Sequence, residues 1–390
     1  MSKPQSTWKI GKGRDVPQVS KELCERILAD LERARRPVLE ATKCSLDNSF
    51  YNSKVGFLTP GDKVVRTELN VSSVQKMSRA IFFLEIFLRH LTSGQVNSKR
   101  ELYYIAKGEC KKNKHLKALD FADQTESDAI IDFVGEMLEC YREELNCFAN
   151  ERGGQTYCQN LVVTETLLDG SKATVDLSTL GTSPFQPKNK PQNFQLKPKK
   201  GKIDFCLIVE SEATAGSLVA NGMTRRHNCI VFGAGGVPSN GVRSWAKAIQ
   251  DQLETPIYFF GDLDAYTIQN IYRTLKAGSA ASLIRNSDFS APEVKFLGVL
   301  PEDIKKYDLS AYNVNQNDPT EARALKKAAD ALKNDPFFKD KRNKGLADIL
   351  DWLIDNKVRC EQQAFYMVAP RDKEMCEKII VEKIKNKIYV

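Results

Sequence analysis

Apolar residues along positions 73–97 recur at steps of three and four, which is the spacing of a helix that buries one face. We expect this helix to begin after Ser73 and to end at Gly94. Its apolar face consists of Val74, Met77, Ile81, Leu84 and Leu88. Ser98 then starts a second helix, because Glu101, three residues later, completes a capping box.

A third helix with the same spacing is expected from about Ser127 to Ala149. Beyond it, the β-branched and apolar run Leu161–Thr164 meets the turn pair Asp169-Gly170, and a second strand-like run follows at Ala173–Val175. This pattern predicts a β-hairpin. Three helices followed by a hairpin is the order of a winged helix-turn-helix (CAP-like) domain, whose hairpin can lie along DNA.

We therefore expect an amino-terminal arm and helix over residues 1–45 and a winged-helix domain over residues 46–180. The arm is basic and flexible to about residue 20, and the helical segment 20–40 is interrupted at Pro37. Residues 181–202 are expected to be an interdomain linker, since their composition cannot build a core. They contain Pro184, Pro187, Pro191, Pro198 and the lysines at 188, 190, 197, 199, 200 and 202.

Residues 203–390 combine buried strands with helices. The expected strands are Ile203–Glu210, Cys229–Phe232, Pro256–Gly261 and Val294–Leu300, with helices at about 214–222, 242–253 and 265–275. Continuous rather than alternating hydrophobicity indicates strands that are covered on both faces, hence a parallel sheet in a doubly wound α/β domain. A helical tail is expected at Thr320–Leu332, Lys344–Asn356 and Asp372–Lys385.

Composition narrows the class of protein. The 390 residues carry 58 Lys and Arg against 50 Asp and Glu, a net charge of +8 that fits a polyanionic partner without requiring one. The ten cysteines form no C-x-x-C pair, so we expect buried thiols in a reducing compartment rather than a disulfide framework or a zinc site. The longest apolar stretch, residues 80–84, is far too short to span a membrane, and the amino terminus has no secretory pattern.

Three carboxylates follow expected strands. Glu210 ends the first strand, and Asp262 and Asp264 follow the third, so all three are expected at the edge of the sheet where α/β sites form. Clustered acids raise one another's pKa unless a cation neutralises them, and oxygen ligands of this number suit Mg²⁺. The alternative is a solvated turn beside a strand-end charge.

The glycine segment Gly233–Pro238 matches neither a dinucleotide-binding nor a Walker phosphate loop. A glycine turn that carries Arg243 could still approach a DNA backbone, and a tight strand-to-helix turn is the other interpretation.

Tyr103 and Tyr104 lie on the capped second helix. A phenol with a pKa of about 10 is a weak nucleophile, and Arg100, one turn earlier, could stabilise its phenolate. Adjacent helical residues point about 100° apart, so only one tyrosine can face a phosphate. Two core aromatic residues are the alternative. The three histidines have no spacing for a metal site and are expected to be structural or exposed.

In their order, these motifs resemble the A subunits of type IIB DNA topoisomerases (topoisomerase VI) and their meiotic double-strand-break relatives. The resemblance extends from about residue 45 onward. Its most specific segments are Ser98–Tyr104, Asp123–Asp128, Arg142–Leu145, Phe148–Gly153, Val209-Glu210, Val242-Arg243, Asp262–Asp264 and Phe296–Pro301.

The resemblance implies that Tyr104 is the nucleophile, that Arg100 assists it, and that a Toprim site at Glu210, Asp262 and Asp264 binds Mg²⁺. It implies cleavage of double-stranded DNA through a reversible 5′-phosphotyrosyl link, with Lys99 and Arg243 among the DNA contacts. The family's A subunits form homodimers in which one protomer's tyrosine works with the other's metal. A GHKL ATPase B subunit completes an A2B2 heterotetramer and uses the ATP, and the location is the cytoplasm and nucleoid, or the nucleus of a eukaryote.

The chain departs from the family pattern in two places. Ala265-Tyr266-Thr267 follows the D-x-D motif where relatives commonly have Pro, an aromatic residue and Gly, and Ser211 stands where Lys is usual. Three alternatives remain open: a break-maker without strand passage, a DNA-binding scaffold with an inactive site, and a Toprim nuclease that hydrolyses through water.

Overall fold

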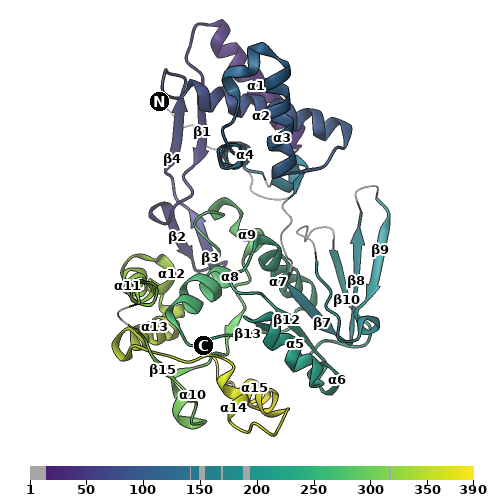
Figure 1. The fold of residues 1–390 in the computed structure, drawn as a ribbon, viewed down its shortest axis with the longest axis vertical. Coiled ribbons are helices and arrows are strands. Elements are labelled where there is room, and N and C mark those ends of the chain that lie inside the picture. The colour runs from purple at the N-terminus through teal and green to yellow at the C-terminus, as the bar shows by residue number, and fades with distance from the viewer. Residues whose placement is uncertain (1–14, 141, 149–153, 168–169, 188–193, 316–317) are drawn as a thin grey trace. The chain divides into compact units, whose positions relative to one another are not determined.

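The computed structural model describes residues 15–140, 142–148, 154–167, 170–187, 194–315 and 318–390. The chain divides into two compact units (Figure 1). The first comprises Met1–Cys44 with Pro60–Asn150, and the second comprises Ser45–Thr59 with Glu151–Val390. Within the described part of the chain, no helix is both long enough and apolar enough to cross a membrane.

The first unit is built on four helices: α1 (Val16–Glu32), α2 (Val74–Ser93), α3 (Lys99–Lys112) and α4 (Gln124–Leu138). Strand β1 (Val38–Thr42) pairs antiparallel with β4 (Val64–Glu68), and the two-residue strands β5 (Asn97–Ser98) and β6 (Cys147–Phe148) pair in parallel. Phe83, Phe87 and Phe121 are fully buried among these helices. Helix α2 begins after Ser73 and ends at Gly94, as expected, and the second expected helix is α3. The expectation of a flexible arm to about residue 20 and a helix over 20–40 is wrong, because α1 begins at Val16 and ends at Glu32.

Helix α4 is shorter than expected. It ends at Leu138 instead of Ala149, because Glu139 adopts a left-handed conformation with φ 46° that stops the helical hydrogen bonds. A single 3₁₀ turn, Arg142–Leu145, and strand β6 follow. Tyr141 and residues 149–153, which were expected in this helix and in the motif after it, lie outside the described residues.

The predicted hairpin exists, but it is not a wing of the first unit. Strands β8 (Leu161–Thr166) and β9 (Lys172–Asp176) pair antiparallel. Strand β10 (Phe194–Pro198) pairs with β8 on its other side, so the three strands form one sheet in the second unit (Figure 1). Residues 168 and 169, at the hairpin turn, lie outside the described residues.

The expected linker over residues 181–202 is also corrected. Phe194 and Leu196, two positions apart on one face of β10, are buried in the core of the second unit. The surrounding prolines and lysines made this strand pattern hard to recognise in the sequence. The Gln252 side chain accepts from the Leu196 N–H at 2.8 Å and donates to the Phe194 carbonyl at 3.0 Å. The boundary between the first unit and the main part of the second unit is therefore near residue 150 and not at 181–202. Residues 188–193 lie outside the described part of the chain.

A five-stranded sheet forms the centre of the second unit. Its order is β14 (Lys295–Phe296), β13 (Ile257–Phe260), β11 (Phe205–Val209), β12 (Cys229–Gly233) and β7 (Gln155–Cys158). The four strands from β14 to β12 are parallel, as predicted, and β7 is an unpredicted antiparallel edge. Every residue of β11, β12 and β13 is buried, so both faces of these strands are covered.

Helices follow the strands of this sheet. They are α5 (Glu212–Ala220), α6 (Met223–Arg226), α7 (Asn240–Leu253), a π-helical turn at Thr267–Tyr272 that continues as α8 (Arg273–Ala277), and α9 (Asn286–Phe289). The expected strand over Val294–Leu300 is only two residues long, because Gly298 turns the chain with φ 88°.

The carboxyl-terminal part is helical, as expected. Its helices are α10 (Pro301–Lys306), α11 (Pro319–Asn334), α12 (Pro336–Lys339), α13 (Lys344–Asn356), α14 (Ala364–Met367) and α15 (Met375–Lys385). Strand β15 (Tyr312–Asn313) pairs with β16 (Val358–Arg359), and the early strands β2 (Ser49–Asn52) and β3 (Phe57–Pro60) form a separate pair. Tyr51 of β2 packs edge-on against Phe337 of α12 at 5.5 Å, which places this pair in the second unit.

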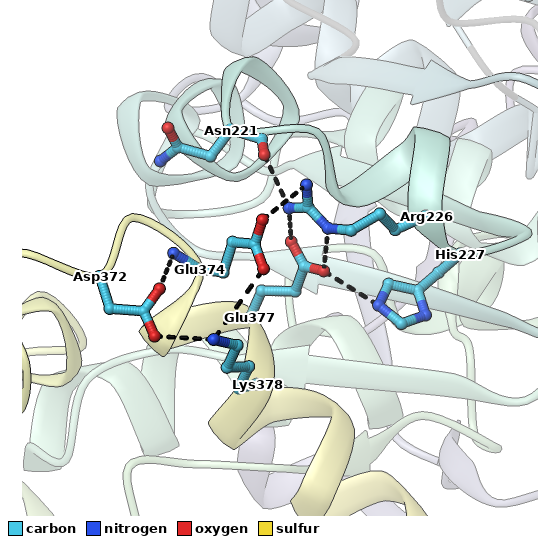
Figure 2. Close-up of polar contacts among 7 residues, drawn as sticks. All are labelled: Asn221, Arg226, His227, Asp372, Glu374, Glu377 and Lys378. Carbon is cyan, nitrogen blue, oxygen red and sulfur yellow. Dashed lines mark hydrogen bonds and ion pairs between the residues drawn. The ribbon is translucent and has the colours of Figure 1, made fainter.

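An ionic cluster holds the last helix in place. Figure 2 shows the Arg226 guanidinium reaching both Glu374 and Glu377, and His227 contacting Glu377. His227 is thus a structural residue, and so is His90, whose Nδ1 is 3.1 Å from the Asn97 amide. All ten cysteines lie in the described part of the chain, and none forms a disulfide; eight are buried.

Candidate functional site

The three predicted acids come together at one edge of the sheet. Glu210 directly follows β11, and Asp262 and Asp264 follow β13. Because β11 and β13 are parallel neighbours with Val209 opposite Phe260, their carboxyl ends meet at this edge. The backbone joins the two segments, since the Asp262 N–H donates to Glu210 Oε2 at 3.1 Å.

Each acid accepts a hydrogen bond from a nearby group. The Thr267 hydroxyl donates to Glu210, and the Thr267 N–H donates to Asp264 Oδ1 at 2.7 Å. The Gln362 N–H donates to Asp262 Oδ1 at 2.9 Å. Carboxylates that accept several hydrogen bonds are held in fixed orientations, so the acids are positioned before any ligand arrives.

Burial and mutual repulsion raise the pKa values of these acids. Desolvation, followed by the Asp262 charge, raises the pKa of Glu210 to about 7. Desolvation raises the pKa of Asp262 to about 6. The hydrogen bonds from Gln362 oppose this increase, and the Asp264 charge adds to it. Burial also raises the pKa of Asp264. A cation would relieve this accumulated negative charge, which favours the predicted metal site over a solvated turn.

The three acids offer only oxygen donors, the type that hard divalent cations prefer. Among the described residues, however, no group of three or more His, Cys, Asp or Glu side chains is arranged so that it could hold a metal ion. Gln362, whose backbone N–H contacts Asp262, is 1% exposed, and its side-chain oxygen Oε1 has no hydrogen-bond partner. An oxygen-only, incomplete set suits an ion that keeps waters and shares its coordination with phosphate.

The segment around Gln362 was missed by the sequence reasoning. The Leu263 N–H donates to the Cys360 carbonyl at 2.8 Å, and the Cys360 N–H returns a bond to the Leu263 carbonyl at 3.1 Å. This bridge fixes the loop that carries both aspartates. No sequence signal indicated it, because a single backbone bridge leaves no periodic pattern.

Tyr104 and Arg100 lie on α3 of the first unit, where the predicted capping box is present. Ser98 Oγ accepts from the Glu101 N–H at 3.2 Å, and the Glu101 carboxylate accepts from the Ser98 N–H at 2.6 Å. The Arg100 guanidinium carbon lies 5.9 Å from the centre of the Tyr104 ring. Within the helix, the arginine and the tyrosine are therefore neighbours.

The two tyrosines have different surroundings. Tyr104 is 57% exposed, whereas Tyr103 is half-buried against the core of the first unit. The Tyr103 hydroxyl accepts from Lys107 Nζ at 3.0 Å, and Lys107 also donates to the Phe121 carbonyl. Tyr103 thus has a packing role, and Tyr104 presents the more accessible phenol.

The two residues expected to contact DNA are engaged elsewhere. Lys99 Nζ is 2.7 Å from Asp132 Oδ1, and its side chain is largely covered. Arg243 is 2% exposed and donates to the Phe289 carbonyl at 3.1 Å and to Asn286 Oδ1 at 3.2 Å. The expectation that Arg243 approaches a DNA backbone is therefore corrected: its guanidinium joins α7 to α9.

The glycine segment is a tight turn beside the acids. The N–H groups of Gly235 and Gly236 both donate to the Glu210 carbonyl at 3.0 Å. Gly235 has φ 76°, and a Cβ there would lie 3.2 Å from a Glu212 carboxylate oxygen. These amides are already satisfied by Glu210, so the turn is not a phosphate cradle.

Comparison with known proteins matches both units. Residues 205–384 match the family model for the Toprim domain of the topoisomerase 6 A subunit and Spo11, and residues 75–147 match the one described as Type IIB DNA topoisomerase. Similar proteins, each named as the A subunit of type 2 DNA topoisomerase 6, occur in Methanocaldococcus jannaschii (29% identical, 88% of each chain) and Pyrococcus horikoshii (29%, 88% of this chain and 87% of the other). The Sulfurisphaera tokodaii protein of that name is 24% identical over 94% of this chain and 93% of its own.

Proposed function

Because the chain belongs to the family of topoisomerase 6 A subunits and Spo11, we propose that it is the DNA-cleaving subunit of a type IIB DNA topoisomerase. The reaction is a transesterification that opens and recloses both strands of a duplex so that another duplex can pass. The observation that carries this proposal is the accessible Tyr104 phenol beside Arg100, in a chain whose second unit brings three partly buried acids to one edge of its sheet.

Tyr104 Oη attacks a backbone phosphorus, and a new phosphorus–oxygen bond joins the tyrosine to the 5′ phosphate. The bond between phosphorus and the 3′ oxygen breaks, and that oxygen takes up a proton from solvent to become the 3′ hydroxyl. The phenol proton passes to solvent or to a nearby base. Arg100 stabilises the phenolate and the charge that develops on the phosphate. Attack by the 3′ hydroxyl reverses the step, so religation needs no external energy source.

We assign the divalent ion of the Toprim unit to Glu210, Asp262 and Asp264, and identify it as Mg²⁺. When bound, it would neutralise phosphate charge at the break. Gln362 and Thr267 hold all three acids in orientation by the hydrogen bonds described above.

The partners follow from the family. We propose that the first unit is a winged-helix-type DNA-binding unit built on α2, α3 and α4, and that it binds double-stranded DNA. Two A subunits form a homodimer in which Tyr104 of one protomer works with the acids of the other. A GHKL ATPase B subunit completes an A2B2 assembly that acts on chromosomal DNA in the nucleoid, or in the nucleus of a eukaryote.

The test is a denaturing gel that detects covalent protein–DNA adducts on supercoiled plasmid with Mg²⁺, with and without ATP and the B subunit. We expect adducts from the wild type and from Tyr103→Phe, and none from Tyr104→Phe. Plasmid cleavage without an adduct would identify a hydrolytic nuclease. No cleavage with the partner present would favour a DNA-binding scaffold, and cleavage without relaxation would favour a break-maker.

A further inference from the structure

Thr267 is buried between two of the acids and contacts both. It is 1% exposed. Its N–H donates to Asp264 Oδ1 at 2.7 Å, which fixes the start of the helical turn after the D-x-D segment. Its Oγ1 lies 3.2 Å from Glu210 Oε1 and 3.0 Å from Glu210 Oε2. The Thr267 hydroxyl is therefore within hydrogen-bond distance of both oxygens of the Glu210 carboxylate.

The position of this hydroxyl matters for metal binding. A donor that is nearly equidistant from the two oxygens of a carboxylate faces the open side between them, where a chelating cation would otherwise sit. Glu210 Oε2 also accepts from the Asp262 N–H at 3.1 Å. A Cβ at Gly261 would lie only 2.7 Å from the same oxygen, so that oxygen is crowded by the backbone. Oε1 is left as the oxygen of Glu210 with more room for a cation.

We propose that the Thr267 hydroxyl restricts Glu210 to binding a metal through a single oxygen, and so makes the site selective for Mg²⁺ over Ca²⁺. Ca²⁺ takes six to eight oxygens and commonly uses both oxygens of a carboxylate, whereas Mg²⁺ takes an octahedral set with one oxygen per carboxylate and several waters. This inference rests on the metal site of the proposed function. Thr267 is a positioning residue in it, since it acts through Glu210.

The measurement is ion binding by the full-length chain without DNA, using Mg²⁺ alone and Ca²⁺ alone in isothermal titration calorimetry. Thr267→Val keeps the side-chain shape and removes the hydroxyl, and Thr267→Ser keeps the hydroxyl. Thr255→Val is the matched control, because Thr255 is also buried but its hydroxyl donates to the backbone carbonyls of Ile203 and Leu253.

We expect Thr267→Val to lower the ratio of Ca²⁺ to Mg²⁺ dissociation constants by about tenfold or more, the scale of changes around metal ligands. Thr267→Ser and Thr255→Val should leave the ratio within about twofold of the wild type. The shift in thermal unfolding temperature on adding each ion gives a second readout of the same ratio.

An unchanged ratio in Thr267→Val, or an equal loss of affinity for both ions, would overturn the inference and leave Thr267 a structural residue. A wild type that binds neither ion would overturn the metal site and the inference together. Failure of the covalent adduct test, with the ion ratio changed as expected, would overturn the cleavage reaction and leave the selectivity of the site established.

Discussion

The backbone N–H of Gln362 donates to Asp262 Oδ1 at 2.9 Å, although 100 positions separate the two residues. The contact brings the carboxyl-terminal region to the three acids, and the Leu263–Cys360 backbone bridge supports it from two residues away. The helical tail is therefore part of the site's framework rather than an appendage to the sheet.

Gln362→Pro should weaken Mg²⁺ binding by about tenfold, because proline has no N–H to donate to Asp262. Gln362→Ala is the matched variant, because it also loses the side chain that contacts Asp262 but keeps the N–H, so the difference between the two variants isolates the backbone contact. Calorimetric titration with Mg²⁺ compares the two. Equal affinity in the wild type and Gln362→Pro would show that the backbone contact does not orient Asp262.

Mg²⁺ binding should strengthen as the pH rises from about 6 to about 8, because the ion competes with protons on acids whose pKa values are raised to about 7 and about 6. The stability of the metal-free protein should change in the opposite direction and decrease as the pH rises. A carboxyl with a higher pKa in the folded state than in the unfolded state favours folding only while protonated, so stability falls as the pH rises through this window.

The check is the thermal unfolding temperature in EDTA and in Mg²⁺ across this range. The difference between the two curves should widen toward the higher pH. Glu210→Gln, which removes the acid whose pKa is raised to about 7, should flatten the EDTA curve. A gap between the curves that does not change with pH would contradict the coupling.

Arg100→Ala should slow adduct formation by about a hundredfold, the usual effect of removing one group that stabilises developing charge. Arg100→Lys should recover part of the rate, because it keeps the charge and loses the planar guanidinium. Arg89→Ala is a control in the same unit, since Arg89 pairs with Glu85 and Glu109. Time courses on the denaturing gel measure the rates, and an unchanged rate in Arg100→Ala would remove Arg100 from the reaction.

The buried pair between Lys383 and Asp303 should be essential for the stability of the second unit. Their side chains are 1% and 3% exposed, and Asp303 also accepts from the Leu300 N–H at 2.8 Å. Lys383→Ala should lower the free energy of unfolding by about 3–5 kcal/mol, because it leaves a buried carboxylate without its partner. Urea unfolding measures this.

The double variant Lys383→Met with Asp303→Asn removes both charges and should be less destabilised than Lys383→Ala. A greater loss in the double variant would mean that the attraction within the pair outweighs the cost of burying it.

Local patterns in the sequence were sufficient to place α2 and α3 and to predict the parallel strands β11, β12 and β13, but not the end of α4 or the length of β14. The Ser98–Glu101 capping box and the left-handed cap at Gly94 depend on residues within one turn of each other, so they are visible in the sequence directly. The order of strands and acids likewise indicated that Glu210, Asp262 and Asp264 would meet, because parallel neighbours end at the same edge.

Other features depend on contacts between distant segments and could not be read from local patterns. Phe194 and Leu196 looked like part of a proline- and lysine-rich linker, and only pairing with β8 shows that they are core residues. Arg243 looked like a surface cation beside a glycine turn, and only packing against α9 shows that its guanidinium is buried.

The amino-acid sequence was enough to indicate the candidate site residues: Arg100 and Tyr104 on the capped helix, and the three acids that follow buried strands. Folding in three dimensions established which tyrosine is accessible and how the acids are held, through Lys107 on Tyr103, Thr267 on Glu210 and Gln362 on Asp262. The difference lies in how far apart along the chain the interacting residues are. Helix caps and strand hydrophobicity arise from neighbours along the chain, whereas burial and the orientation of a carboxylate depend on whichever segment folds against it.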